Sequence, residues 1–114
     1  MSSRSGQLTQ PQIRSIEEAA KNSFEKGKLM KGSRMMEQLV DYSFETGTFD
    51  EVASLDVTVT YTEVLARFGR NERALKIVRS IVDVRDRKLG ILDQRSIYAR
   101  YLMGVLLNKV KRYE

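Results

Sequence analysis

A series of basic residues in the second half of the sequence is the strongest candidate for chemistry. It comprises Arg70, Arg73, Lys76, Arg79, Arg85, Arg87 and Lys88. The first four recur in steps of three, so on a helix they would follow one another around its surface and could neutralise several phosphates together, as DNA- and RNA-binding proteins do. No aromatic residues interleave with these bases, and no helix-turn-helix signature is present. We therefore expect a solvated or ion-paired helix face and keep nucleic-acid binding as the alternative.

Acidic pairs, Glu17-Glu18 and Asp50-Glu51, are the other candidates for chemistry. Adjacent residues diverge on a helix, so neither pair would converge on one substrate. The sequence has no histidine and no cysteine, which removes the usual zinc ligands, the thiolate nucleophile and the acid-base group that titrates near neutral pH. It also lacks a phosphate-binding glycine loop and the acid spacing of a calcium loop. We predict that the protein is not an enzyme, uses no metal or cofactor, and has no small-molecule substrate.

The net charge of +5 is unevenly distributed along the chain. Residues 35–66 contain seven acids and neither Lys nor Arg, whereas residues 67–91 contain eight bases and three acids. Opposite charges in a small domain commonly meet at partly solvated faces. We expect part of the basic surface to face the acidic surface, within one molecule or between two.

Length and composition indicate one folded domain. The 114 residues are 41% apolar and 31% charged, which is ordinary for a packed protein of about 100 to 150 residues. No apolar run is long enough to span a membrane, and the first residues lack the apolar stretch of a secretory signal. We predict that residues 1–9 form a flexible tail, that residues 10–114 form a single helical domain, and that the protein is cytoplasmic and does not associate with membranes.

The first half of this domain begins with two expected helices. Thr9 can cap a helix that has Pro11 in its first turn and ends at about Gly27. Residues 28–31 read as a connector, and Ser33 reads as the cap of the second helix.

Residues 55–62 admit two readings. They alternate apolar and polar side chains, and most are β-branched or aromatic, which is the usual sign of a strand. Over a wider window, however, apolar residues fall at steps of three and four, which is typical of an amphipathic helix of about five turns. A lone strand would also lack a pairing partner. We favour the helix and keep the strand as the alternative.

The second half predicts two further helices. Gly69 should form a left-handed corner, and Asn71 should cap a helix with the apolar stripe Ala74, Ile77, Val78, Ile81 and Val84. Residues 85–90 read as a charged turn. Asp93 then caps a last helix that runs to about Lys111 and is apolar almost all round in its middle, so we expect it to be buried against more than one neighbour. The prediction is an all-α fold of about five helices in antiparallel hairpins.

Residues 61–81 resemble a tetratricopeptide repeat. Leu65 matches the large residue late in the first helix, Gly69 the corner glycine, and Ala74 and Val78 the small and large packing positions of the second helix. The end of the chain resembles the start of another copy through Met103-Gly104, Leu107 and the aromatic residue in Arg112-Tyr113-Glu114, and residues 47–51 are a fainter echo. Thr62 and Lys111 depart from the pattern, and the spacing between copies exceeds the family's.

The resemblance implies that the first helix of each repeat lines a concave peptide-binding face. This points to Glu63 and Arg67 in one copy and to Tyr98, Asn108 and Lys109 in the other. The family's clamp of Lys and Asn residues for a terminal carboxylate is not reproduced. The resemblance also implies that the chain stops inside a repeat, so it would be a fragment or would complete its core by pairing with another chain.

Together these features predict a binding protein. We expect an adaptor or regulatory module that uses a helical-hairpin surface for protein-protein interaction, with a protein partner or with a second copy of itself. A small basic helical protein that binds DNA or RNA through the face from Arg70 to Lys88 is the alternative.

Overall fold

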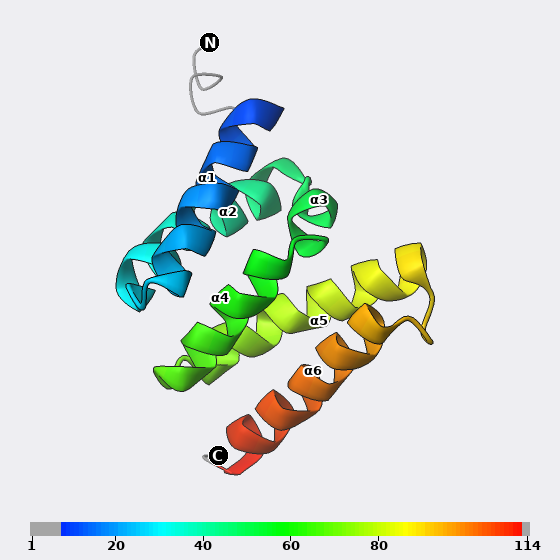
Figure 1. The fold of residues 1–114 in the computed structure, drawn as a ribbon. Coiled ribbons are helices and arrows are strands. Elements are labelled where there is room, and N and C mark those ends of the chain that lie inside the picture. The colour runs from blue at the N-terminus through cyan, green and yellow to red at the C-terminus, as the bar shows by residue number, and fades with distance from the viewer. Residues whose placement is uncertain (1–7, 113–114) are drawn as a thin grey trace.

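The computed structural model describes residues 8–112, with only the backbone of Arg112, and these residues form six α-helices. The helices are α1 (Gln10–Glu25), α2 (Leu29–Thr46), α3 (Phe49–Ala53), α4 (Asp56–Arg67), α5 (Asn71–Leu89) and α6 (Gln94–Arg112). Figure 1 shows them as hairpins, with the α1–α2 pair at one side of the molecule and α6 at the opposite side. The all-α prediction is confirmed.

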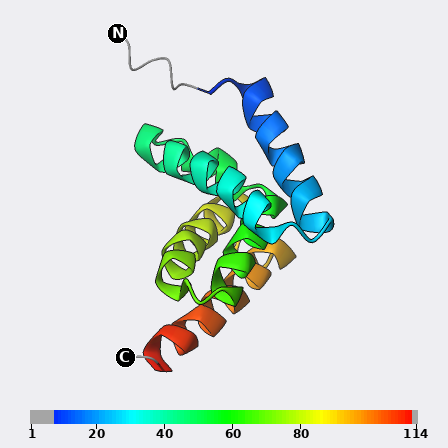
Figure 2. The same ribbon diagram turned by 90° about the vertical axis from the view of Figure 1, so that its left-hand side faces the viewer.

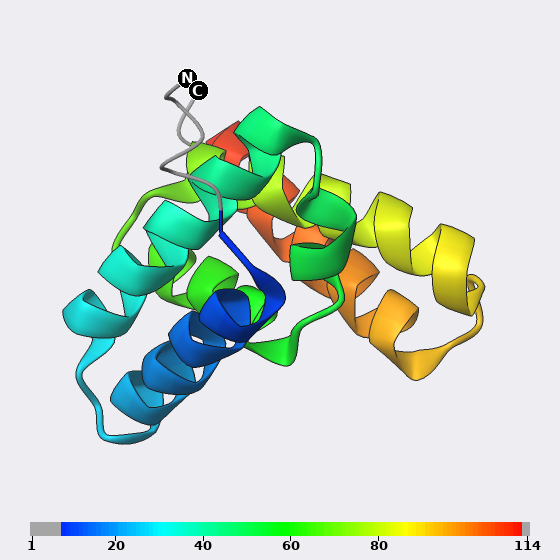
Figure 3. The ribbon, with the colours of Figure 1, turned by 90° about the horizontal axis from the view of Figure 1, so that it is seen from above.

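The hairpins follow one another in chain order. In Figure 2 the α1–α2 pair, the α4–α5 pair and α6 succeed each other down the molecule. Figure 3, seen from above, shows the turn between α5 and α6 projecting beyond the α1–α2 pair. None of the helices within residues 8–112 combines the length and the apolar character needed to cross a membrane.

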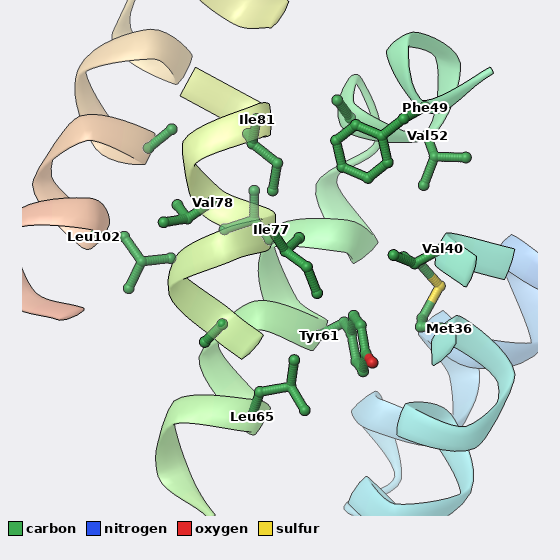
Figure 4. Packing of buried hydrophobic residues seen from close by; sticks show 14 of the residues in the cluster. Met36, Val40, Phe49, Val52, Tyr61, Leu65, Ile77, Val78, Ile81 and Leu102 are labelled. Carbon is green, nitrogen blue, oxygen red and sulfur yellow. The ribbon is translucent and has the colours of Figure 1, made fainter. Parts of the chain in front are cut away.

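One core joins the helices. Its buried members come from every helix, and Figure 4 shows Met36 and Val40 of α2 facing Tyr61 of α4 and Ile77 of α5 across it. Leu102 and Leu106 extend the core to α6. Burial of these side chains is the main favourable term in holding the hairpins together.

The start of α1 is fixed by a reciprocal cap. Thr9 Oγ1 accepts from the backbone N–H of Gln12, and the Gln12 side chain accepts from the backbone N–H of Thr9. The backbone N–H of Leu8 donates to Tyr42 Oη at 2.8 Å. Leu8 and Thr9 are therefore part of the folded domain, and the predicted tail is wrong for them; its residues 1–7 lie outside the described part of the chain.

The predicted connector at residues 28–31 is wrong, because α2 already begins at Leu29 and Ser33 lies inside it. Gly32 is a helix-interior glycine for a tertiary reason. A Cβ built at Gly32 would lie 2.6 Å from Cε1 of Phe24, so the missing side chain lets α2 approach α1. The sequence signal was read as a helix boundary when it marks a helix contact.

Residues 49–67 are helical apart from Ser54 and Leu55, and the strand alternative is wrong. The single long helix expected there is also wrong, because the extended backbone of Leu55 divides it into α3 and α4. Two polar residues of the alternating pattern, Thr58 and Thr62, are buried in the core. The Thr58 hydroxyl donates to the carbonyl oxygen of Val52 at 2.6 Å, and the Thr62 hydroxyl donates to that of Thr58 at 2.9 Å. Hydroxyls satisfied in this way can lie in a core beside apolar side chains.

The corner between α4 and α5 forms at Gly69, with φ of 81°, as predicted. Asn71 is the first residue of α5 rather than its cap, and no side chain caps this helix. The predicted charged turn at residues 85–90 is wrong, because α5 continues to Leu89. Arg85 is consequently buried at 3% exposure.

The cap of α6 is confirmed, since Asp93 Oδ1 accepts from the backbone N–H of Arg95 at 2.9 Å. The predicted burial of α6 against more than one neighbour is wrong. Only one side, with Ala99, Leu102 and Leu106, enters the core, mainly against α5. Several apolar residues of α6 remain at the surface.

We predict that Gly32→Ala destabilises the protein even though alanine favours a helix by about 1 kcal/mol over glycine. The added methyl overlaps the Phe24 ring, and overpacking of this kind costs about 1 to 3 kcal/mol. Denaturant unfolding of Gly32→Ala in the wild type and in a Phe24→Ala background measures the coupling. In the second background the same change should stabilise; equal effects in both would contradict the contact.

We also predict that Arg85→Met lowers the free energy of unfolding by about 3 kcal/mol, because it strips buried carbonyl groups of a charged donor. The matched control is Arg87→Met, which removes an exposed guanidinium bound to Asp50 and Asp83 and should change stability little. Denaturant titration of both variants checks this. Similar losses in the two would argue against a special role for Arg85.

Candidate functional site

Two hollows flank α4 and form the best candidate site. One, of about 540 Å³, lies between α1 and α4, and the other, of about 400 Å³, lies between α4 and α6. Both are lined by Asp56, Thr60 and Arg95, so they adjoin along the same side of α4. We call the two hollows together the α4 groove. Figure 1 shows α4 lying between α1 and α6. Both of these helices contribute residues to the lining of the groove.

The α1 side of the groove combines an apolar floor with a charged rim. Phe24, Leu55 and Val57 supply apolar surface. Glu17, Lys21 and Glu25 follow at steps of four along α1, so they form one edge. An apolar side chain of a partner could be buried here while its charged neighbours meet the rim.

The α6 side has Arg85 in its wall. The guanidinium donates to three backbone carbonyl groups, those of Ala53 at 3.3 Å, Arg95 at 3.2 Å and Leu55 at 3.5 Å. Burial lowers the pKa of Arg85, and the carboxylate of Asp56, 3.9 Å away, works against this. Arg85 therefore ties α5 to the start of α4 and to the start of α6, which fixes the distance between the walls of this hollow.

Tyr98 and Glu63 join the walls of the same hollow. The Tyr98 hydroxyl donates to Glu63 Oε2 in a hydrogen bond between α6 and α4. This bond, together with burial and the negative charge of Glu63, raises the pKa of Tyr98 to about 12. The pair holds the tyrosine in its protonated, donating form and positions its ring in the lining of this hollow.

Arg95 is held at the other end of the hollow. Its guanidinium donates to both carboxylate oxygens of Asp93, at 3.1 and 3.2 Å, and its backbone N–H donates to the same side chain. These bonds lower the pKa of Asp93 and raise that of Arg95. The cap of α6 thereby also sets the position of a groove residue.

The predicted partner-binding residues are only partly brought together. Glu63 and Tyr98 meet in the α4 groove, Arg67 is exposed at the end of α4, and Lys109 is half-buried on α6. Asn108 lines a different hollow, on the outer side of α6.

The predicted nucleic-acid residues do not form one free face. The Arg73 guanidinium donates to Asp41 at 2.8 Å and to the Tyr61 hydroxyl. Burial acts to lower the pKa of Arg73, but these two hydrogen bonds outweigh it, so the pKa is raised. The ammonium of Lys76 lies 5.4 Å from the centre of the Phe44 ring. Arg85 is buried and Arg87 is paired with acids, whereas Arg70, Arg79 and Lys88 are exposed.

These pairs also confirm the expected meeting of the two charge blocks. Asp41 and Asp50 of the acidic block each bind an arginine of the basic block, Arg73 and Arg87. Two arginines of the basic block therefore form ion pairs within the molecule, and these pairs connect α2 and α3 to α5.

Sequence reasoning missed most of the groove, although two signals were present. Asp56, Thr60, Glu63 and Arg67 recur at helical spacing and mark the solvent side of α4. Arg85 follows Ile81 by four residues and Val78 by seven, which places it on the buried stripe of α5. Its charge had suggested exposure, whereas its spacing indicated burial.

The groove is suited to binding by shape and charge. Within residues 8–112, no cluster of acids has the grouping of a metal site. Arg85 and Arg95 are engaged with carbonyl groups and with Asp93, whereas the side chain of Asp56 is 95% exposed. With Glu17 and Glu25 on the rim, the remaining charge of the groove is weakly negative.

We predict that the free energy of unfolding falls as the pH rises from 10 to about 12, because the stabilisation from the Tyr98–Glu63 hydrogen bond is lost over this range. The folded state keeps the Tyr98 proton up to about 12, whereas the unfolded chain loses it near 10, so the stabilisation is complete below pH 10 and is lost as the pH rises through the higher value. The measurement is the free energy of unfolding of the wild type minus that of Tyr98→Phe across this range. Glu63→Gln should remove the same dependence; parallel curves for wild type and Tyr98→Phe would refute the assignment.

Comparisons with known proteins found no match for this chain. No family model, curated protein or solved structure matches it. The tetratricopeptide resemblance stays a prediction, and its last part, at Tyr113 and Glu114, lies outside the described residues.

Proposed function

We propose that this chain is a non-catalytic adaptor or regulatory module that binds a segment of a partner protein in the α4 groove. The observation that carries the proposal is the pair of adjoining hollows on one side of α4, lined by residues of α1, α4 and α6 and by Arg85 of α5. Grooves between helices are common places for peptide recognition, because the apolar side chains of a segment can fill successive hollows.

The lining supports a segment with apolar anchors and positive charge. Phe24, Leu55 and Val57 offer apolar surface on the α1 side, and Val59 does so on the α6 side. The exposed carboxylate of Asp56 lies between the two hollows. Lys or Arg residues beside the anchors would meet this carboxylate and the acidic rim of α1.

The groove is also held open by contacts that do not depend on a ligand. Arg85 fixes the start of α4 against the start of α6, and the Tyr98–Glu63 bond joins the second turn of α6 to the middle of α4. A site held in this way loses less conformational freedom on binding than a flexible one. The nucleic-acid alternative has weaker support, because several of its basic side chains, those of Arg73, Lys76 and Arg87, already contact other side chains of the molecule.

The test is selection of peptides from a random displayed library on the full chain. We expect peptides with apolar residues and Lys or Arg, and we expect Thr60→Trp, which fills the centre of the groove, to weaken their binding by at least about tenfold in calorimetry. Gln38→Trp, at an exposed position of α2, is the matched control and should have no effect. Peptides that bind Thr60→Trp as well as wild type, or a failure to select any, would overturn the proposal.

A further inference from the structure

The turn between α5 and α6 presents two large aliphatic side chains to solvent. Ile91 and Leu92 are 61% and 84% exposed, and neither belongs to the core. The backbone N–H of Asp93 donates to the carbonyl group of Gly90 at 3.2 Å, so the two residues occupy the central positions of a hydrogen-bonded turn. Such positions normally carry glycine, proline, asparagine, aspartate or serine. Two exposed aliphatic residues there indicate contact with another molecule.

The turn is held in shape by its own backbone. Gly90 has φ of 92°, a conformation that suits glycine, and its N–H donates to the carbonyl group of Asp86 at 3.0 Å. On the other side of the turn, Asp93 caps α6. Figure 3 shows the turn projecting beyond the α1–α2 pair. We call Ile91 and Leu92 together the aliphatic tip; it is ordered in advance and placed where a second molecule can reach it.

The free charge beside the aliphatic tip is positive. Asp86 and Asp93, the acids that flank the turn, are each bound to an arginine. Lys88, two residues before Gly90, is exposed and forms no ion pair among the described residues. The turn therefore combines apolar anchors with one available ammonium group, which is the chemistry expected of a ligand of the α4 groove.

The α1 side of the α4 groove has the complementary lining. Its hollow of about 540 Å³ has an apolar floor that includes Phe24 and Leu55, and it is large enough for two aliphatic side chains. On the rim, Glu17 and Glu25 outnumber Lys21, and within residues 8–112 none of these three side chains is in an ion pair. A lysine beside an apolar anchor would be attracted to this rim.

We propose that the aliphatic tip of one copy of the chain binds in the α4 groove of the next copy, with Lys88 against the acidic rim of α1. The inference rests on the proposed function, because it names the chain itself as a ligand of the same groove. Tip and groove are different surfaces, so the contact is head-to-tail, and a pair keeps one unoccupied tip and one unoccupied groove for further copies. A partner segment then competes with self-association for the groove.

Sedimentation equilibrium of the full chain, from roughly 1 µM to 1 mM, tests the contact. A short turn buries less surface than a standard interface, so we expect association in the upper part of this range, with species larger than a dimer. Thr60→Trp fills the groove and the double change Ile91→Ser with Leu92→Ser removes the tip; each should weaken association by at least about tenfold. Gln38→Trp and Met30→Gln, at exposed positions of α2, are the controls and should leave it unchanged.

Mixing the two variants tests the head-to-tail geometry. The tip of Thr60→Trp is intact, and so is the groove of the double variant, so an equimolar mixture should regain the wild-type affinity but stop at one-to-one pairs. This recovery also shows that both variants are folded. A mixture that associates no better than either variant alone would overturn the geometry.

Charge reversal tests the role of the acidic rim. Lys88→Glu should weaken association, because the new carboxylate meets Glu17 and Glu25, whereas Arg79→Glu, at an exposed position in the middle of α5, should not. Stronger association of Lys88→Glu would overturn this placement of the tip.

A wild-type chain that is monomeric throughout the range would overturn the inference, and so would association that Thr60→Trp leaves intact. The proposed function would survive either result if displayed peptides still bound the wild type and not Thr60→Trp. Binding of a monomeric chain to vesicles of anionic phospholipid, lost in the double variant, would overturn the inference by identifying a different occupant of the tip.

Discussion

The guanidinium of Arg85 lies inside the molecule and donates to the carbonyl groups of Ala53, Leu55 and Arg95. Burying a charge is unfavourable unless its donors are satisfied, and the five donors of a planar guanidinium can serve several acceptors at once, which a lysine ammonium could not match in this geometry. Since these acceptors belong to the α3–α4 junction and the start of α6, one side chain positions three helices. The width of the α4 groove depends on it.

The two charge blocks complete this arrangement at the surface. Arg73 joins α5 to Asp41 of α2, and Arg87 joins it to Asp50 of α3, so the basic helix lies against the acidic segments. Exposed pairs of this kind contribute little stability, but they oppose arrangements that would place like charges together. The net charge of the chain is therefore a poor guide to its partner.

Some features decided by neighbouring residues were predictable from the sequence, although Ser33 and Asn71 are not the predicted caps, whereas two features decided by tertiary contact were misread. Thr9, Gly69 and Asp93 were assigned correctly because a cap or a left-handed turn depends on the residue and its immediate neighbours. Gly32 and Arg85 were misread, since a glycine within a helix and a basic residue near its end acquire their meaning only from α1 and from the α3–α4 junction. Of the candidate site, Glu63 and Tyr98 were named from the resemblance, but the walls from α1 were not.

The two sides of α6 bear on each other. Tyr98 faces Glu63 across the groove, whereas Gly104 and Leu107 line the hollow on the outer side, so occupation of one surface leaves the other accessible.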